Sequence, residues 1–174
     1  NVCNHLINGI KEQYGKIDGV IHAAGILKDA LLWRKSLEDA KAVMAPKIYG
    51  TKYLDYAIGN DELDYMIFCS SLASSIGNIG QCDYCYANGF MDYFAQKRNE
   101  MVIKGLRKGK TISINWCPWK TSKMSVSDDF KKYIEKTLGM QALELEDGIQ
   151  AFEDATKAGK SQFTVFKGNT NLIR

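Results

Sequence analysis

The 174-residue sequence lacks several features that would mark specialised classes of protein. It has only two prolines, and it contains no low-complexity run and no internal repeat. Its 23 basic and 20 acidic residues leave a net charge of +3, which is too mild to indicate binding to nucleic acid or to an anionic membrane. No stretch approaches the length needed to cross a bilayer, and the segment 1–15 has no apolar signal-peptide core. We therefore expect a soluble, cytoplasmic protein with no nucleic-acid or membrane partner.

The five cysteines are odd in number and lie scattered through apolar segments. A disulfide scaffold would be shorter and denser in cysteine, so free thiols in a reducing cytosol are the simpler interpretation. Cys82 and Cys85 form a Cys-x-x-Cys pair, but no second half-site accompanies it, because His5 and His22 are isolated. We expect no metal site, and we interpret His22 as a residue that orients a loop.

The alternation of strand and helix patterns predicts an α/β fold. Short apolar runs predict strands, and apolar residues at helical spacing predict helices. The predicted strands span 17–25, 64–71, 110–116 and 162–166. The predicted helices span 1–15, 37–58, 81–102, 128–138 and 145–158. Connections of this length imply right-handed crossovers, so we expect a doubly wound parallel sheet flanked by helices, with no internal domain boundary.

Polar residues suited to catalysis lie at the second predicted strand and at the helix that follows it. Ser71 ends the strand, and ligands of open parallel sheets bind outside the carboxyl ends of strands. Tyr84 and Asn88 are four residues apart, so they share one face of the helix. A tyrosine can protonate a carbonyl that accepts hydride if a neighbouring lysine lowers its pKa from about 10, and a serine can orient the same carbonyl. Taken alone, Tyr84 and Asn88 could simply pack and cap the helix.

Several motifs relate the sequence to a known family. They are His22-Ala23-Ala24-Gly25, Pro46-Lys47, Phe68-Cys69-Ser70-Ser71, Gly80-Gln81-Cys82-Asp83-Tyr84-Cys85-Tyr86-Ala87-Asn88 and Ile114-Asn115-Trp116-Cys117-Pro118-Trp119. With them the chain resembles the short-chain dehydrogenase/reductase superfamily, and more closely the ketoreductase domains of modular type I polyketide synthases. Most short-chain reductases have a Tyr-x-x-x-Lys motif, whereas polyketide ketoreductases have the lysine and asparagine exchanged. This chain shows the exchange, since Asn88 follows Tyr84 and Lys47 lies on the earlier predicted helix.

The resemblance implies a role for each matching residue. Tyr84 would be the proton donor, and Ser71 would orient the substrate carbonyl. Lys47 would hold the pKa of Tyr84 down, and Asn88 would complete the proton-relay network. The residues that would border the nicotinamide of the cofactor are Ala24, Gly25 and Pro118.

The sequence contains no Gly-x-Gly-x-x-Gly turn, which in complete reductases cradles the cofactor pyrophosphate. The resemblance therefore implies that residues 1–174 are the C-terminal, catalytic portion of a single ketoreductase domain. In the family's sheet order 3-2-1-4-5-6-7, this portion would supply strands 4-5-6-7 of a partial Rossmann-type sheet. Its first strand would expose an apolar edge at Val20–Ala23, and such an edge invites pairing with another chain. We expect either an oligomer or a separate N-terminal half as the partner.

The function implied by the resemblance is NADPH-dependent reduction of a β-ketoacyl group to a β-hydroxyacyl group during polyketide biosynthesis. The substrate would be tethered by phosphopantetheine to an acyl carrier protein. The isolated chain would bind dinucleotide weakly and turn over little. One alternative is a non-catalytic structural or interaction remnant of a ketoreductase within a megasynthase. Another is a free-standing reductase of a soluble metabolite, which the exchange of lysine and asparagine disfavours.

Two positions bear on the stereochemistry of the product. Leu27-Lys28-Asp29 resembles the Leu-Asp-Asp element of ketoreductases that set a D-configured hydroxyl, with its first aspartate replaced by lysine. Ile76 stands where ketoreductases of the opposite stereochemical class usually have a tryptophan. Both features favour a D-hydroxyl product.

Overall fold

The computed structural model describes residues 2–121, 132, 134–137 and 139–169. Within them, four strands form one parallel sheet in the order β1-β2-β3-β4. The strands are β1 Gly19–His22, β2 Tyr65–Ser71, β3 Lys110–Trp116 and β4 Gln162–Thr164. The helices are α1 Val2–Tyr14, α2 Leu37–Ile58, α3 Ala73–Ile76, α4 Cys82–Ile103 and α6 Leu145–Lys157, with a 3₁₀ turn at Leu32–Arg34. The α/β fold and the parallel, helix-flanked sheet are as predicted from the sequence.

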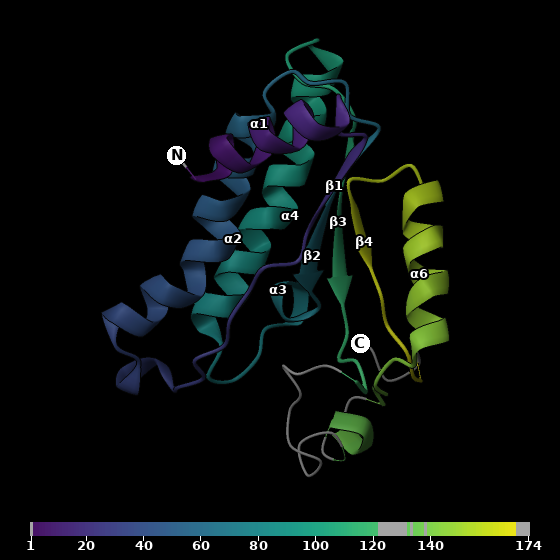
Figure 1. Ribbon diagram of the computed structural model, residues 1–174. Coiled ribbons are helices and arrows are strands. Elements are labelled where there is room, and N and C mark those ends of the chain that lie inside the picture. Colours follow the sequence, from purple (N-terminus) through teal and green to yellow (C-terminus); the bar gives the residue numbers. More distant parts are fainter. Residues whose placement is uncertain (1, 122–131, 133, 138, 170–174) are drawn as a thin grey trace.

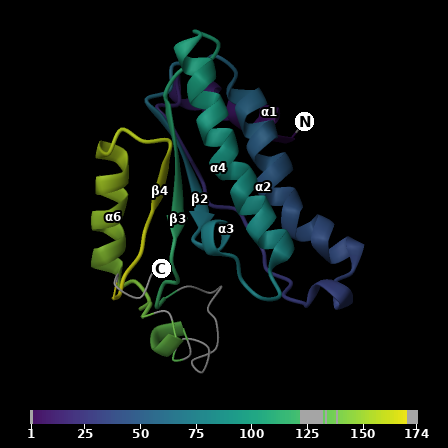
Figure 2. The ribbon, with the colours of Figure 1, turned by 180° about the vertical axis from the view of Figure 1, so that it is seen from behind.

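The helices cover both faces of the sheet (Figure 1). Helices α1, α2 and α4 lie on one face, and α6 lies on the other; Figure 2 shows the same layers from behind. The carboxyl ends of the strands point toward the bottom of Figure 1, where α4 begins and the short helix α3 follows β2. β1 is an edge strand, as expected, and Ile21 on it is 53% exposed.

The predicted element boundaries agree with the structure wherever a long pattern was available. Helix α2 and strand β3 have the predicted limits, while β1 and β4 are shorter than predicted. The sequence analysis missed α3 and the 3₁₀ turn, because a single turn is too short to show a helical period. The helix predicted over 128–138 lies mostly outside the described residues.

The sheet separates two apolar clusters. Since side chains alternate along a strand, β2 sends Met66 and Phe68 to one face and Ile67 to the other. The first cluster packs under α1, α2 and α4, and its buried members are Ile7, Ile58, Leu63, Met66, Phe68, Met91 and Ala95. The second cluster faces α6 and includes Ile67, Ile112, Ile114, Leu143 and Ala155. Burial on both faces explains why the β2 sequence is continuously apolar before its serines.

Strand β3 behaves differently, because its side chains toward α4 are polar and yet buried. Thr111, Ser113 and Asn115 are all 0% exposed. The guanidinium of Arg98 on α4, also 0% exposed, donates to Thr111 Oγ1 at 2.9 Å and to Asp55 Oδ1 of α2 at 2.8 Å. It also donates to the carbonyls of Lys108 and Gly109, each at 3.0 Å. These bonds join α2, α4 and the start of β3 at the end of the sheet opposite the carboxyl ends.

Candidate active site

The predicted site residues gather at the carboxyl end of the sheet. Ser71 is the last residue of β2 and pairs in register with Trp116, the last residue of β3. Ala24 and Gly25 follow β1, and Pro118 follows β3. Tyr84 lies in the first turn of α4, which begins at this same end. The parallel topology is what brings these distant segments together.

Lys47 enters the site from α2 with its side chain almost fully buried. Its Nζ atom lies 5.7 Å from the centroid of the Tyr84 ring and donates a hydrogen bond to the Cys69 carbonyl at 2.9 Å. Burial lowers the pKa of Lys47 from 10.5 to about 8, and the nearby Cys69 and Asp92 oppose that shift. His22 Nε2 donates a 3.0 Å hydrogen bond to the carbonyl oxygen of Pro46, the residue just before Lys47. Lys47 and Tyr84, predicted to act together, therefore do lie together.

Burial is the largest influence on the pKa of Tyr84. Burial of the phenol raises its pKa above the usual value, and the neighbouring side chains of Ser71 and Asn88 lower it by less. That Lys47 lowers this pKa stays a prediction.

Asn88 lies one helical turn after Tyr84 and is 0% exposed. Its Nδ2 atom donates to the Tyr84 carbonyl at 2.8 Å, which fixes the side chain against the helix. Its Oδ1 atom is buried and has no hydrogen-bond partner in the described part of the chain. Asn4 and Asn115 each have a buried Oδ1 atom of the same kind, so this feature is not confined to Asn88.

The residues predicted to border a nicotinamide lie on loops that are tightly held. A Cβ atom added to Gly25 would lie 3.0 Å from Lys47 Cε, a tight contact, so the absence of a side chain at residue 25 lets the loop run close to the lysine. Pro118 is half-buried, and its carbonyl accepts a 2.8 Å hydrogen bond from the Leu143 amide. Ala24 is exposed beside them. Their predicted place beside a nicotinamide stays a prediction.

The next residue of the post-β3 loop, Trp119, packs against helix α6. A Cβ atom added to Gly148 would lie only 1.9 Å from Cη2 of the Trp119 ring. Trp119 also contacts Trp116, with ring centroids 5.0 Å apart. Gly148 therefore makes room for the indole that anchors the loop carrying Pro118.

The loop that carries Leu27-Lys28-Asp29 is tied to the start of α4 by contacts that the sequence analysis missed. Lys35 and Asp83 form an ion pair at 3.0 Å, and both side chains are only 4% exposed. Asp29 accepts a 2.9 Å hydrogen bond from Gln81 Nε2. Lys28 instead turns outward to Asp39 at 2.6 Å. No spacing rule pairs Lys35 with Asp83, because Lys35 lies in the loop before α2 and Asp83 in the first turn of α4.

Comparison with known proteins shows the family. The family model described as the KR domain matches residues 1–121. The chain belongs to this family. It is 39% identical to the polyketide synthase PksN of Bacillus subtilis (strain 168) over 169 residues, and 38% identical to PksL of the same organism. These alignments cover 97% of the chain but only 3% and 4% of the relatives.

Solved structures of ketoreductases share the fold. A ketoreductase domain from the bacillaene assembly line matches with a TM-score of 0.96 and 37% identity over 98% of this chain. An N-terminal ketoreductase from the macrolactin assembly line matches with a TM-score of 0.86 and 36% identity over 98% of the chain. The chain spans 41% and 32% of the lengths of those two proteins. The predicted membership of the polyketide ketoreductases and the Rossmann-type fold are confirmed.

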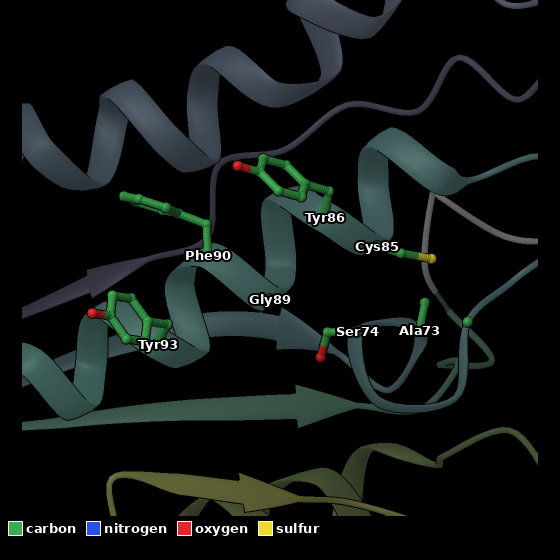
Figure 3. A pocket seen from close by; sticks show the side chains of 8 residues that line it. Ala73, Ser74, Cys85, Tyr86, Gly89, Phe90 and Tyr93 are labelled. Atoms are coloured by element: carbon green, nitrogen blue, oxygen red, sulfur yellow. The ribbon is translucent and has the colours of Figure 1, made fainter. Parts of the chain in front are cut away.

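The ketoreductase chain also has a shallow groove of about 470 Å³ on the outer side of α4 (Figure 3). It lies between α3 and α4 and is lined in part by Ala73, Ser74, Gly77, Tyr86, Phe90 and Tyr93. None of the four predicted catalytic residues is among the described residues that line it. This groove is therefore separate from the site at the carboxyl end of the sheet.

The described part of the ketoreductase chain has neither a cluster of potential metal ligands nor a helix that could span a membrane. Among these residues, no group of three or more His, Cys, Asp or Glu side chains is placed to hold a metal ion. None of their helices combines the length and apolar character that spanning a membrane requires.

Proposed function

We propose that this chain carries the catalytic residues of a domain that reduces a β-ketoacyl group to a β-hydroxyacyl group during polyketide biosynthesis. The proposed substrate is tethered by phosphopantetheine to an acyl carrier protein, and the proposed cofactor is NADPH. The observation that carries this proposal is the approach of Lys47 Nζ to within 5.7 Å of the Tyr84 ring centroid, beside the end of β2 that bears Ser71. Membership of the ketoreductase family supports the same reaction.

The proposed chemistry assigns one step to each side chain. When bound, the nicotinamide supplies hydride to the carbonyl carbon of the substrate. The phenol of Tyr84 donates its proton to the carbonyl oxygen, and its raised pKa keeps it protonated and available at neutral pH. The hydroxyl of Ser71 donates a hydrogen bond to the same oxygen and orients it. Lys47, with a pKa of about 8, is mostly charged at neutral pH and stabilises the phenolate that remains.

The cofactor is proposed to span this chain and a further part of the domain. Ala24, Gly25 and Pro118 would border the nicotinamide. The chain has no Gly-x-Gly-x-x-Gly turn, so we propose that a separate N-terminal portion of the domain holds the pyrophosphate. The exposed edge at β1, where Ile21 is 53% exposed, would pair with that portion or with a second chain.

A D-configured hydroxyl is proposed for the product. The support is the Leu27-Lys28-Asp29 element together with Ile76. Lys28, which departs from the family pattern, turns outward to Asp39, whereas Asp29 keeps a hydrogen bond to Gln81, close to Tyr84 in sequence. The substitution at position 28 therefore leaves the contact between this element and α4 in place.

The test uses the complete domain with NADPH and a β-ketoacyl thioester, and follows the loss of reduced nicotinamide by absorbance. We expect Tyr84→Phe to abolish turnover, because phenylalanine has no proton to donate. Tyr86→Phe is the matched control on the same helix, since Tyr86 is exposed, and it should retain activity. Absence of activity in the wild-type domain would support the non-catalytic alternative. Chiral chromatography of the product then decides its configuration.

A further inference from the structure

A carboxylate that the proposed chemistry does not use lies just behind the site. Asp92 on α4 is two helical turns beyond Tyr84 and one turn beyond Asn88. Its Oδ2 atom accepts hydrogen bonds from Ser74 Oγ at 2.6 Å and from Asn115 Nδ2 at 2.7 Å. Its Oδ1 atom accepts from Ser113 Oγ at 2.6 Å. One side chain thus joins the tyrosine helix to α3 and to two positions of β3.

The contacts of Asp92 extend to the backbone of Ser71. The Ser74 hydroxyl lies 2.8 Å from the Ser71 carbonyl as well as 2.6 Å from Asp92, so both oxygens compete for its proton. The side-chain Nδ2 atom of Asn115 lies 2.6 Å from Ser74 Oγ. Because a carboxylate accepts hydrogen bonds only, Asp92 forces Asn115 to direct its NH₂ group, and not its oxygen, toward this cluster.

The turn held in this way is the one that sets the direction of the Ser71 side chain. Ser71 Oγ accepts a 3.2 Å hydrogen bond from the Ala73 amide. The Leu72 amide donates to the Trp116 carbonyl at 2.9 Å, which fixes the turn to the end of β3. Figure 3 shows Ser74 on this turn, beside α4. A shift of the turn relative to α4 would move the Ser71 hydroxyl relative to the phenol of Tyr84.

Asp92 is also a source of negative charge for Lys47. It favours the charged form and so raises the pKa of Lys47 against the larger lowering by burial. The other groups that face Lys47 are Cys69 of β2, His22 of β1 and Tyr84 of α4. Of these neighbours, Asp92 is the carboxylate, so its loss removes a fixed anion from the surroundings of the lysine.

We propose that Asp92 is a positioning residue of this site, which holds the turn from β2 to α3, and with it Ser71, in register with Tyr84. The inference rests on the proposed function, because it assigns Asp92 to the same reaction. It goes beyond that function in naming the side chain that couples the serine to the tyrosine helix. Asp92 itself donates nothing to the substrate.

The test compares Asp92→Asn with wild type in the complete domain, using NADPH and a β-ketoacyl thioester. Asp92 now accepts hydrogen bonds from Ser74, Ser113 and Asn115. An asparagine replaces one acceptor oxygen by an NH₂ group, which cannot accept, so the cluster must rearrange. We expect kcat to fall by about tenfold or more, the usual scale for losing hydrogen bonds to a charged group, with little change in KM. The alkaline limb of the pH profile should move to lower pH, because Lys47 loses its proton more easily without the anion. An unmoved limb would show that the charge of Asp92 does not act on Lys47. The fall in kcat at unchanged KM is the result that a role in stability alone would not give.

Ser74→Ala is a second variant, which removes only the hydroxyl between Asp92 and Ser71. It should lower kcat by less than Asp92→Asn, and the double variant should be no worse than Asp92→Asn alone. This variant decides the matter if Asp92→Asn fails to fold. Asp154→Asn on α6 makes the same chemical change at an exposed site and should retain wild-type kcat.

Hydrogen exchange separates the two proposals. In Asp92→Asn the amides of residues 71–76 should exchange faster than in wild type, whether or not the domain reduces the thioester. Suppose that the wild-type domain is active and that Asp92→Asn has the same kcat, pH profile and hydrogen exchange. This result would overturn the role of Asp92 and leave the reductase function standing. An inactive wild type would overturn the reductase function, and unchanged exchange at 71–76 would then still reject the positioning role.

Discussion

Replacing Lys47 by methionine should make the domain more stable while it abolishes reduction. Burial lowers the pKa of Lys47 from 10.5 to about 8. At about 1.4 kcal/mol for each pKa unit, the folded state disfavours the ammonium by about 3 kcal/mol relative to the unfolded chain. Methionine has a similar length and no charge, so it removes this cost. The lost hydrogen bond to the Cys69 carbonyl offsets about 1 kcal/mol, which leaves an expected gain of about 2 kcal/mol near neutral pH.

The gain should depend on pH in a direction that follows from the lowered pKa. Between about pH 8 and 10.5 the unfolded chain holds the lysine proton and the folded chain does not, so the stability of wild type rises with pH. The electrostatic cost, about 3 kcal/mol near pH 7, should therefore fall to about 1 kcal/mol at about pH 9.5. Denaturant unfolding of wild type and Lys47→Met at both pH values measures this difference.

Lys52→Met is the matched control, since Lys52 is exposed on the same helix, and its effect should stay within about 0.5 kcal/mol. A Lys47→Met domain that is less stable than wild type near neutral pH would refute the reasoning. So would a stability difference that does not change with pH. Retained reductase activity in Lys47→Met would refute the role proposed for the ammonium.

Three further predictions follow from the packing of the described residues. Arg98→Met should lower the free energy of unfolding by about 2–4 kcal/mol, because the carbonyls of Lys108 and Gly109 lose their donor and the Asp55 carboxylate keeps only Arg107 as its cationic partner. Gly148→Ala should lower it by about 1–3 kcal/mol and change tryptophan fluorescence, since the new methyl group would displace the Trp119 ring. In the native domain a thiol reagent should modify the exposed Cys82 first, and should reach the buried Cys117 only on unfolding.

Each of these has a clear contrary result. A loss below about 1 kcal/mol for Arg98→Met would mean that the guanidinium network is not the link between α4 and β3. Unchanged fluorescence and stability in Gly148→Ala would show that the indole does not pack on α6. Equal rates of modification for Cys82 and Cys117 in native protein would contradict the burial of the second thiol.

Much of the fold was readable from local sequence patterns. The helix Leu37–Ile58 and the strand Lys110–Trp116 have the limits that their patterns predict, because periodicity is a property of neighbouring residues. The site residues Ser71, Tyr84 and Asn88 were identified from their places at a strand end and on one helix face. Lys47 came only from the family resemblance, since nothing local connects it with a tyrosine on another helix.

Other features depended on elements that meet only in the folded chain. Along β3, Thr111, Ser113 and Asn115 alternate with isoleucines, a pattern typical of a strand with one solvent-exposed face. These three polar residues are nevertheless fully buried against α4. They can be buried because Arg98 donates to Thr111, and Asp92 accepts from Ser113 and from Asn115 Nδ2. Asn115 Oδ1 is buried without a partner among the described residues. The spacing of residues along the chain does not predict that side chains of α4 will hydrogen-bond to those of β3.

The sequence by itself determined the kind of fold, the end of the sheet where chemistry would occur and most of the residues placed there, because these follow from periodicity, strand ends and motif. Only the tertiary structure decided the electrostatics. The pKa of Tyr84 is raised because its phenol is buried, and the pKa of Lys47 is lowered for the same reason. Burial is a property of everything that packs around a side chain, so it cannot be read from the residues beside it in the sequence.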